Sequence, residues 1–282
     1  MKNFIVRTIT AVFFVAAIVS CFLRPEAMIL LFGLVTGMTI WEFTGLVNER
    51  EDVNVNQMIS TVAGVYLFLA MAGYNSGLTP AAVFIPYLVT LIYLMVAELY
   101  LKQPDPVNDW AYTMMSQLYI ALPFSLLSVL AFQSDDTGIH YTWTVPLSVF
   151  IFLWINDTGA YLCGSLFGKH KLFPRISPGK SWEGNIGGGI LVILVAVLVW
   201  YLSEQYGENP LGLSAIEWAG LGLTVVIFGT WGDLVESLFK RTLGIKDSGH
   251  ILPGHGGMLD RFDSSLMAIP AAVVYLYTIS IL

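Results

Sequence analysis

The run IGGGILVILVAVLVWYLS, residues 186–203, decides the fold class, because it holds eighteen consecutive residues without a charge. A helix that crosses the hydrocarbon core of a bilayer needs about 20 mostly apolar residues. Comparable runs lie at residues 4–23, 26–46, 57–77, 80–101, 110–132, 143–163, 215–236 and 265–282. They are continuously apolar and lack the alternation typical of a transmembrane β-barrel. The sequence therefore predicts an all-α integral membrane protein with about nine transmembrane helices.

The composition supports this class, since 56% of the 282 residues are hydrophobic and only 12% are charged. Soluble domains carry about 25% charged residues. No basic patch on a soluble domain is present, which argues against nucleic acid as a partner. Cys21 and Cys163 both lie in apolar runs, so no disulfide framework is expected. The first run has a basic start but no small-residue cleavage site, and we interpret it as a retained span.

Lys and Arg residues collect in two of the connecting segments, and their positions predict the orientation. Four lie between residues 168 and 182, and four lie between residues 237 and 264. Two predicted helices separate these segments, so both loops fall on one side, which the positive-inside rule makes cytoplasmic. The N-terminus is then cytoplasmic and Leu282 is outside. We divide the single membrane domain into residues 1–140, about five scaffold helices, and residues 141–282, which carry the charged loops.

Acidic residues flank the second basic segment. Asp233, Glu236, Ser237 and Lys240 are spaced to share one helical face, and a carboxylate there is costly if it faces lipid. This face is expected to line the protein interior or a wet cavity, although an internal ion pair at a snorkelling helix end is an alternative. Farther on, Asp260 and Asp263 lie three residues apart at the expected start of the last helix. Helix capping would account for only one of them.

Further candidates lie in the predicted sixth span and in the first basic loop. Asp157 lies within an apolar run, where a carboxylate indicates function by default, although Asn156 or Tyr161 could satisfy it structurally. In SPGKSWEG, Lys180 and Ser181 suit phosphate oxygens, and the following Glu183 is either a ligand or a cap. The letters GKS do not indicate a P-loop, because the required upstream glycine and βαβ context are absent.

The types of residue in these segments together predict a class of reaction. Carboxylates are ligands for Mg²⁺, and Lys and Arg bind phosphates. Gly254, Gly256 and Gly257 around His255 indicate a backbone that passes close to another group, with a turn of no function as the alternative. Phosphoryl and nucleotidyl transfer require this combination, because they depend on positioning and charge neutralisation. Histidines are scarce near the acids, which disfavours zinc.

The segment SLFKRTLGIKDSGHILPGHGGMLDRFDS, residues 237–264, resembles the signature of the phosphatidate cytidylyltransferase (CDP-diacylglycerol synthase) family. Its matching positions are Ser237, Lys240, Arg241, Lys246, Asp247, Gly249, Leu252, Pro253, His255, Gly256, Gly257, Met258, Asp260, Arg261, Phe262 and Asp263. The stretches from Asn156 to Tyr161, from Ser177 to Gly184 and from Gly232 to Ser237 are similar to that family in the same order. Gly179 and Ser181 stand where many members have Lys and Thr. The resemblance covers the second half of the chain.

The resemblance implies the reaction CTP + phosphatidate → CDP-diacylglycerol + diphosphate, with Mg²⁺ as cofactor and a second, monovalent or divalent, cation left open. It implies that metal ligands come from Asp233, Asp260 and Asp263, with Asp157 as a further candidate. The implied catalytic residues are Lys240, Asp263, Asp247 and His255, and the implied substrate-binding residues are Lys180, Ser181, Ser237, Arg241, Lys246 and Arg261. The expected location is the bacterial inner membrane, with the site at the cytoplasmic face and a homodimer left open.

Two other functions remain as alternatives. A CTP-dependent lipid-alcohol kinase would also need Mg²⁺ and basic loops, but it would release CDP rather than diphosphate. A secondary transporter for a phosphorylated solute would place its site near the bilayer midplane, between inverted repeats. The charges of this chain gather at one face and no repeat is visible, which disfavours the transporter.

Overall fold

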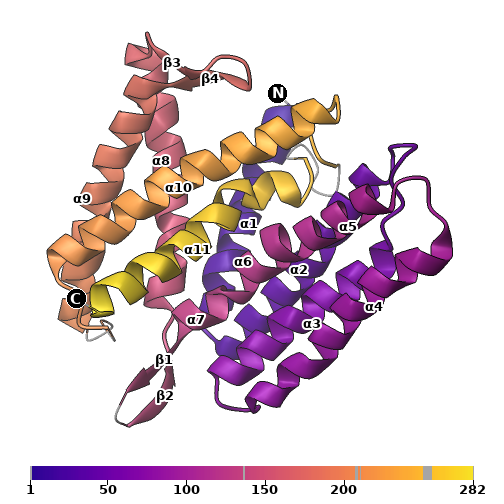
Figure 1. Ribbon diagram of the computed structural model, residues 1–282. Helices are drawn as coiled ribbons and strands as arrows, with labels where there is room; N and C mark the ends of the chain where they lie inside the picture. The colour runs from indigo at the N-terminus through magenta and orange to yellow at the C-terminus, as the bar shows by residue number, and fades with distance from the viewer. Residues whose placement is uncertain (1, 136, 207–208, 210, 250–255, 282) are drawn as a thin grey trace. The chain divides into compact units, whose positions relative to one another are not determined.

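The computed structural model describes residues 2–135, 137–206, 209, 211–249 and 256–281, with side chains from residue 10 onward except those of residues 135 and 281. These residues form two compact units, 1–141 with 247–262 and 142–246 with 263–282. The described helices confirm the all-α membrane fold class (Figure 1). Each unit is described by itself below.

The first unit is built from apolar helices and one short hairpin. Its elements are α1 (Lys2–Phe22), α2 (Pro25–Val47), α3 (Gln57–Asn75), the 3-10 turn η1 (Ala81–Phe84), α4 (Ile85–Leu101), α5 (Pro106–Met115), the π-helical η2 (Ser116–Ala121), α6 (Leu122–Ser125), α7 (Leu127–Ala131), β1 (Phe132–Asp135) and β2 (Gly138–Tyr141). The strands β1 and β2 pair antiparallel, with Phe132 opposite Tyr141. Neither strand was expected from the sequence.

A π-helical stretch joins α5 to α6 without breaking the span. Pro123 in the first turn of α6 has no N–H and would crowd the preceding turn of an α-helix. The amide of Leu122 donates instead to the carbonyl of Gln117, five residues back. This wider turn keeps the backbone groups satisfied, as the bilayer requires, and residues Pro106–Ala131 act as one candidate span.

The core of the first unit is an aromatic cluster that receives the first turn of α11. Phe262 is 2% exposed, and its ring lies within 5.4–6.1 Å of the rings of Phe14, Phe32 and Phe124. Phe32 also contacts Phe22. Phe262, the apolar residue of the sequence DRFD, thus anchors the start of α11 in the first unit.

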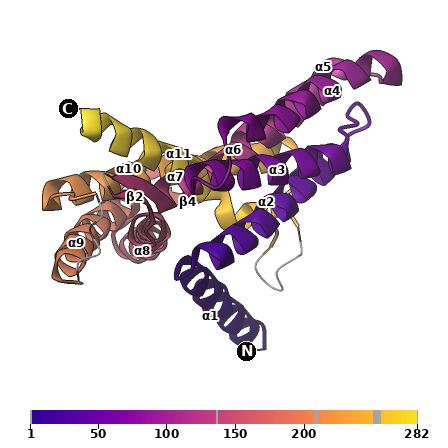
Figure 2. The ribbon, with the colours of Figure 1, turned by 90° about the horizontal axis from the view of Figure 1, so that it is seen from below.

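The second unit holds the longest helices. Its elements are α8 (Thr144–Phe167), β3 (Lys171–Phe173), β4 (Ser177–Ser181), α9 (Trp182–Tyr206), α10 (Ala215–Thr242) and α11 (Leu259–Ile281) beyond its first turn. Figure 2 shows α8 and α9 side by side, as in Figure 1. Glycines permit this close packing, because a Cβ on Gly159 would lie 2.9 Å from the Cα of Gly188.

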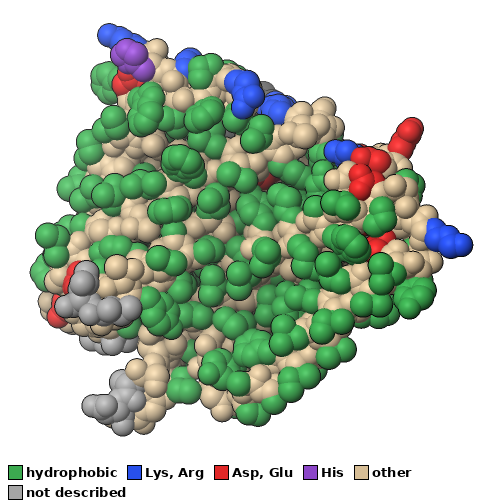
Figure 3. Space-filling model, viewed as in Figure 1, with side chains coloured by type: hydrophobic (Ala, Val, Ile, Leu, Met, Phe, Trp, Pro, Cys, Tyr) green, Lys and Arg blue, Asp and Glu red, His purple; other side chains and the backbone are tan. Residues whose placement is uncertain are grey.

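The number and ends of the spans differ slightly from expectation. Among the described residues, eight helices are long and apolar enough to cross a membrane, and Thr10–Phe22 of α1 forms a shorter apolar helix. Hydrophobic side chains cover most of the face in Figure 3, as a bilayer core demands. The sixth run, expected to end at residue 163, continues to Phe167 in α8, so Asp157 lies nearly three turns before the helix end.

Candidate functional site

The site in the second unit begins where α10 and α11 approach most closely. Gly232 is buried, and a Cβ at this position would lie 2.7 Å from the carbonyl oxygen of Asp263 and 3.1 Å from the Cα of Ser264. Only a residue without a side chain permits this backbone contact. Asp233 follows Gly232 directly, so the contact sets Asp233 beside the start of α11.

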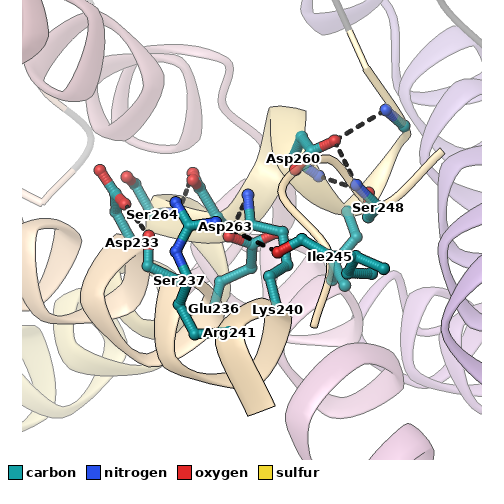
Figure 4. A network of polar contacts seen from close by, with 12 residues as sticks. Asp233, Glu236, Ser237, Lys240, Arg241, Ile245, Ser248, Asp260, Asp263 and Ser264 are labelled. Carbon is teal, nitrogen blue, oxygen red and sulfur yellow. Dashed lines mark hydrogen bonds and ion pairs between the residues drawn. The ribbon is translucent and has the colours of Figure 1, made fainter. Parts of the chain in front are cut away.

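Asp233 is held by two partners in the second unit. The Nζ of Lys180, from β4, lies 2.6 Å from its Oδ2. The hydroxyl of Ser237 donates to its Oδ1 over 3.1 Å (Figure 4). The side chains of Lys180 and Asp233 are 27% and 28% exposed, so solvent reaches the pair. Asp263 is half-buried and lies within electrostatic reach of Asp233, Asp157 and Lys180. The structure thus brings together four of the predicted residues, from α8, β4, α10 and α11.

This group fits a magnesium ion that arrives with a phosphate substrate. Among the described residues, no group of three or more His, Cys, Asp or Glu side chains is arranged to hold a metal ion by itself. Mg²⁺ usually binds one or two carboxylates and takes its other ligands from water and substrate phosphates. Asp233 and Asp263, on adjacent helices, supply that smaller set of hard oxygen donors.

The basic loop after α8 is a short antiparallel hairpin, β3–β4, with Lys171 opposite Ser181. Ser181 is buried, and its hydroxyl accepts the amide N–H of Gly184, so it caps the N-terminus of α9. Glu183 accepts the backbone N–H groups of Lys169 and His170, which fixes the entry to the hairpin. These contacts are not those of a helix cap, because the two amides belong to the hairpin entry and Ser181 accepts the N–H at the start of α9. Lys180 therefore projects from an anchored strand.

The rest of the predicted helical face of α10 is also observed. Glu236 is fully buried, and its Oε2 lies 2.7 Å from the Nζ of Lys240, one turn later. Breaking such a buried pair is costly, because it leaves an uncompensated charge. The Nη1 of Arg241 donates to the carbonyl of Ile245, which closes the C-terminal end of α10. The alternative for this face, an internal pair of Asp233 with Lys240, is not what the structure shows: Lys240 pairs with Glu236, and Asp233 pairs with Lys180 of β4.

The signature residues in the first unit form a second cluster. The Oδ2 of Asp260 accepts the N–H groups of Ser248 and Gly257, at 2.8 and 2.9 Å, while the hydroxyl of Ser248 accepts the N–H of Asp260 (Figure 4). Gly256 has φ +83° and a Cβ there would collide with the Asp260 carboxylate. The expected close approach at these glycines is therefore to acidic side chains of the chain itself. Asp260, predicted as a metal ligand, is engaged in closing the loop before α11.

One member of this cluster was not predicted from the sequence. Glu42, in α2, is 9% exposed, and its carboxylate accepts hydrogen bonds from Ser248, Met258 and Leu259. The apolar run 26–46 begins with Glu26 and holds one further acid, Glu42, in its interior, which is the same signal that singled out Asp157. It was overlooked because the motifs drew attention to the second half of the chain.

The remaining predicted residues lie at exposed positions or outside the described part. Lys246, Asp247 and Arg261 are exposed, so their side chains are accessible to a ligand. Asp157, one of the four residues brought together above, is also exposed, on α8. His255, like Gly254, lies outside the residues that the structure describes.

Comparison with known proteins gives one consistent result. A model of the Cytidylyltransferase family matches residues 5–279. The chain is similar to the phosphatidate cytidylyltransferase of Staphylococcus aureus, strain COL, with 34% identity over 268 residues that cover 94% of this chain and 96% of the relative. It is 37% identical over 250 residues to the protein of that name from Staphylococcus haemolyticus, over 86% and 90% of the two chains. The protein of that name from Staphylococcus epidermidis is 33% identical over 268 residues.

Proposed function

Since this chain belongs to the cytidylyltransferase family, we propose that it is a phosphatidate cytidylyltransferase, which makes CDP-diacylglycerol from CTP and phosphatidate. The relatives of that name match it over 86% to 94% of its length. The structural observation that carries the proposal is the meeting of Asp233, Lys180 and Asp263 where α10 and α11 approach each other. This group combines carboxylates for a cation with an amine for phosphates.

In this reaction a phosphate oxygen of phosphatidate attacks the α-phosphorus of CTP. The new bond joins that oxygen to the phosphorus, and the bond to the bridging oxygen of the β-phosphate breaks, which releases diphosphate. The nucleophile is already ionised near neutral pH, so no strong general base is required. The main obstacles are repulsion between two anions and the charge that develops on the leaving group, and charge neutralisation lowers both.

The basic residues neutralise these charges in the proposal. Lys180 is placed by its strand beside Asp233, so its amine is held where phosphates would bind. Lys240, Arg241, Lys246 and Arg261 add positive charge along the signature, with Arg suited to bidentate phosphate contacts. Asp247 and His255 orient these basic residues. Ser181 supports them through Lys180, and Ser237 supports them through Asp233.

The carboxylates serve the cation. Asp233 and Asp263 would hold Mg²⁺, with Asp260 and Asp157 as further candidates, and the bound ion would screen the phosphates and stabilise the departing diphosphate. Lys180 balances Asp233 through the 2.6 Å ion pair. The acids therefore have a positively charged partner before any substrate binds.

The protein is an integral membrane protein, and we place it in the bacterial plasma membrane with the site at the cytoplasmic face. The basic loops support this orientation by the positive-inside rule. The N-terminus is then cytoplasmic and the C-terminus outside. CTP reaches the site from the cytoplasm, and phosphatidate reaches it within the inner leaflet.

The test is product analysis with detergent-purified protein, CTP and phosphatidate, with and without EDTA. The proposal expects CDP-diacylglycerol and diphosphate in equal amounts, and loss of both with EDTA. In a parallel incubation with a lipid alcohol in place of phosphatidate, release of CDP with a phosphorylated lipid alcohol would instead identify a kinase. Equal turnover in EDTA and in Mg²⁺ would contradict the role of the acids.

A further inference from the structure

The carboxylate of Glu42 joins the first half of the chain to the signature loop. This loop, Asp247–Met258, precedes α11 and is described at residues 247–249 and 256–258. Glu42 lies on α2, more than 200 residues away in sequence, and the residues that donate hydrogen bonds to it belong to the same unit as α2.

The carboxylate binds both ends of the loop at once. At one end the hydroxyl of Ser248 donates to Oε1. At the other end the N–H of Met258 donates to Oε2 over 2.9 Å, and the N–H of Leu259 donates to Oε1 over 3.0 Å. The last two are free amides at the N-terminus of a helix, where a negative charge is favoured. Glu42 therefore caps α11 from another helix.

Two signature glycines make room for this carboxylate. A Cβ on Gly249 would lie 2.7 Å from the Oε2 of Glu42 and 3.3 Å from the Cα of Gly257. A Cβ on Gly257 would collide with the carboxylate directly. The two ends of the loop thus close around one acidic group, and any larger residue at Gly257 would displace it. The carboxylate of Glu42 is therefore sufficient to require glycine at Gly257, and it contributes to that requirement at Gly249.

The hydrogen bonds of the cluster form a closed circuit. Ser248 donates its hydroxyl proton to Glu42 and accepts the N–H of Asp260, while Asp260 accepts the N–H groups of Ser248 and Gly257. Each acid therefore holds the same two ends of the loop. Without Glu42, buried N–H groups at Met258 and Leu259 would lose their acceptor, which favours separation of residues 247–249 from residues 256–259.

We propose that Glu42 is a positioning residue for cytidylyl transfer, which holds residues 247–249, residues 256–258 and the start of α11 in the arrangement that binds CTP. The inference rests on the proposed function, because the loop carries Asp247 and is flanked by Lys246 and Arg261. Glu42 acts only through the loop. Loss of the Glu42 carboxylate lowers the fraction of protein in which these residues are arranged to bind CTP.

This role predicts a specific kinetic result. If CTP binding requires the two described ends to be held together, the apparent affinity for CTP falls in proportion to the fraction of protein in which they are held, while saturating CTP restores that arrangement. Glu42→Gln keeps the shape but can satisfy only part of the three donors, so KM for CTP should rise by about tenfold or more while kcat changes less. A defect that merely reduces the amount of folded protein lowers the rate at every CTP concentration and leaves KM unchanged. Glu51→Gln, an exposed position, is the matched control and should match wild type in both constants.

Hydrogen exchange of the purified full chain supplies a readout that does not depend on activity. In Glu42→Gln, the amides of Gly257, Met258 and Leu259 should exchange at least about tenfold faster than in wild type, with the amides of α9 unchanged. Wild-type KM together with wild-type exchange at these amides would overturn the proposal. Faster exchange at these amides in a protein whose wild type makes no CDP-diacylglycerol would refute the proposed function and leave the anchoring role of Glu42 standing.

A double-mutant cycle covers the case in which Glu42→Gln unfolds as a whole. Gly257→Ala should be strongly impaired, because its methyl group meets the Glu42 carboxylate. In Glu42→Ala/Gly257→Ala that obstacle is gone, so the second change should add little to the effect of Glu42→Ala alone. Additive losses in the cycle would overturn the proposal.

Discussion

Replacing Gly232 with Ala tests whether the α10–α11 contact sets the geometry of the site. The added Cβ would lie 2.7 Å from the carbonyl oxygen of Asp263 and 3.1 Å from both the Cα and the carbonyl oxygen of Ser264. All three are backbone atoms, so no side-chain rotation can relieve the contact. Ordinary van der Waals contact begins at 3.4 Å, and the helices must therefore separate by about 0.7 Å at this point.

Two opposing effects set the size of the stability change. Overpacking of a close contact costs about 1–3 kcal/mol, and Ala in place of Gly returns up to about 1 kcal/mol through helix propensity. We expect a net loss of about 1 kcal/mol in the free energy of unfolding. The effect on the rate should be larger, because a misplacement of about 1 Å can cost a catalyst about 100-fold. With Asp233 adjacent to the contact, we expect turnover to fall by about tenfold or more.

The assay is CDP-diacylglycerol formation by detergent-purified variants, with thermal unfolding measured on the same samples. Gly189→Ala is the matched control, because it also adds a methyl group inside a helix but meets only the Val226 side chain at 3.6 Å. It should keep wild-type turnover. If Gly232→Ala were as active and as stable as Gly189→Ala, the reasoning from the helix contact would be refuted.

Two further substitutions separate the roles of neighbouring hairpin residues. Lys180→Met removes the 2.6 Å ion pair with Asp233 and should lower turnover by about tenfold or more. Lys171→Met, at an exposed position of the same hairpin, is the control and should keep turnover near wild type. Equal losses of turnover by the two variants in initial-rate assays would speak against a specific role for Lys180. Ser181→Ala removes the cap of α9 and should lower the free energy of unfolding by about 1 kcal/mol with KM for CTP unchanged. A raised KM at unchanged stability in thermal unfolding would show that Ser181 contacts the nucleotide instead.

The helices could be predicted from the sequence because the bilayer imposes a simple rule. A span must be apolar and must satisfy its own backbone, so each long apolar run became a helix within a few residues of its expected place. The run 215–236 illustrates the limit, since the helix continues to Thr242. The extra turns are polar, and they are stabilised by local contacts such as the Glu236–Lys240 pair.

The shared face of α10 could also be predicted, because spacing along one helix determines which side chains are neighbours. The Asp233–Ser237 and Glu236–Lys240 contacts follow this rule. Contacts between distant segments could not be derived in the same way. Neither the pairing of Lys180 with Asp233 nor the two hairpins has a periodic pattern that would reveal them.

The role of Glu42 shows what a search for motifs omits. The signature glycines indicated a close approach, but the group they approach comes from α2, far away in the sequence. A lone carboxylate in an apolar run is informative by itself, because its burial is costly unless it is paired. Examining every such acid in all the runs would have pointed to Glu42.

The most direct test of the account is the transfer rate of Asp263→Asn across a series of Mg²⁺ concentrations. The substitution keeps the shape and removes the charge beside Asp233, so the variant should insert and unfold like wild type while CDP-diacylglycerol formation falls by about 100-fold or more at every Mg²⁺ concentration. Near-normal CTP incorporation by this variant would contradict the claim that acids from α10 and α11 together serve the cation in cytidylyl transfer.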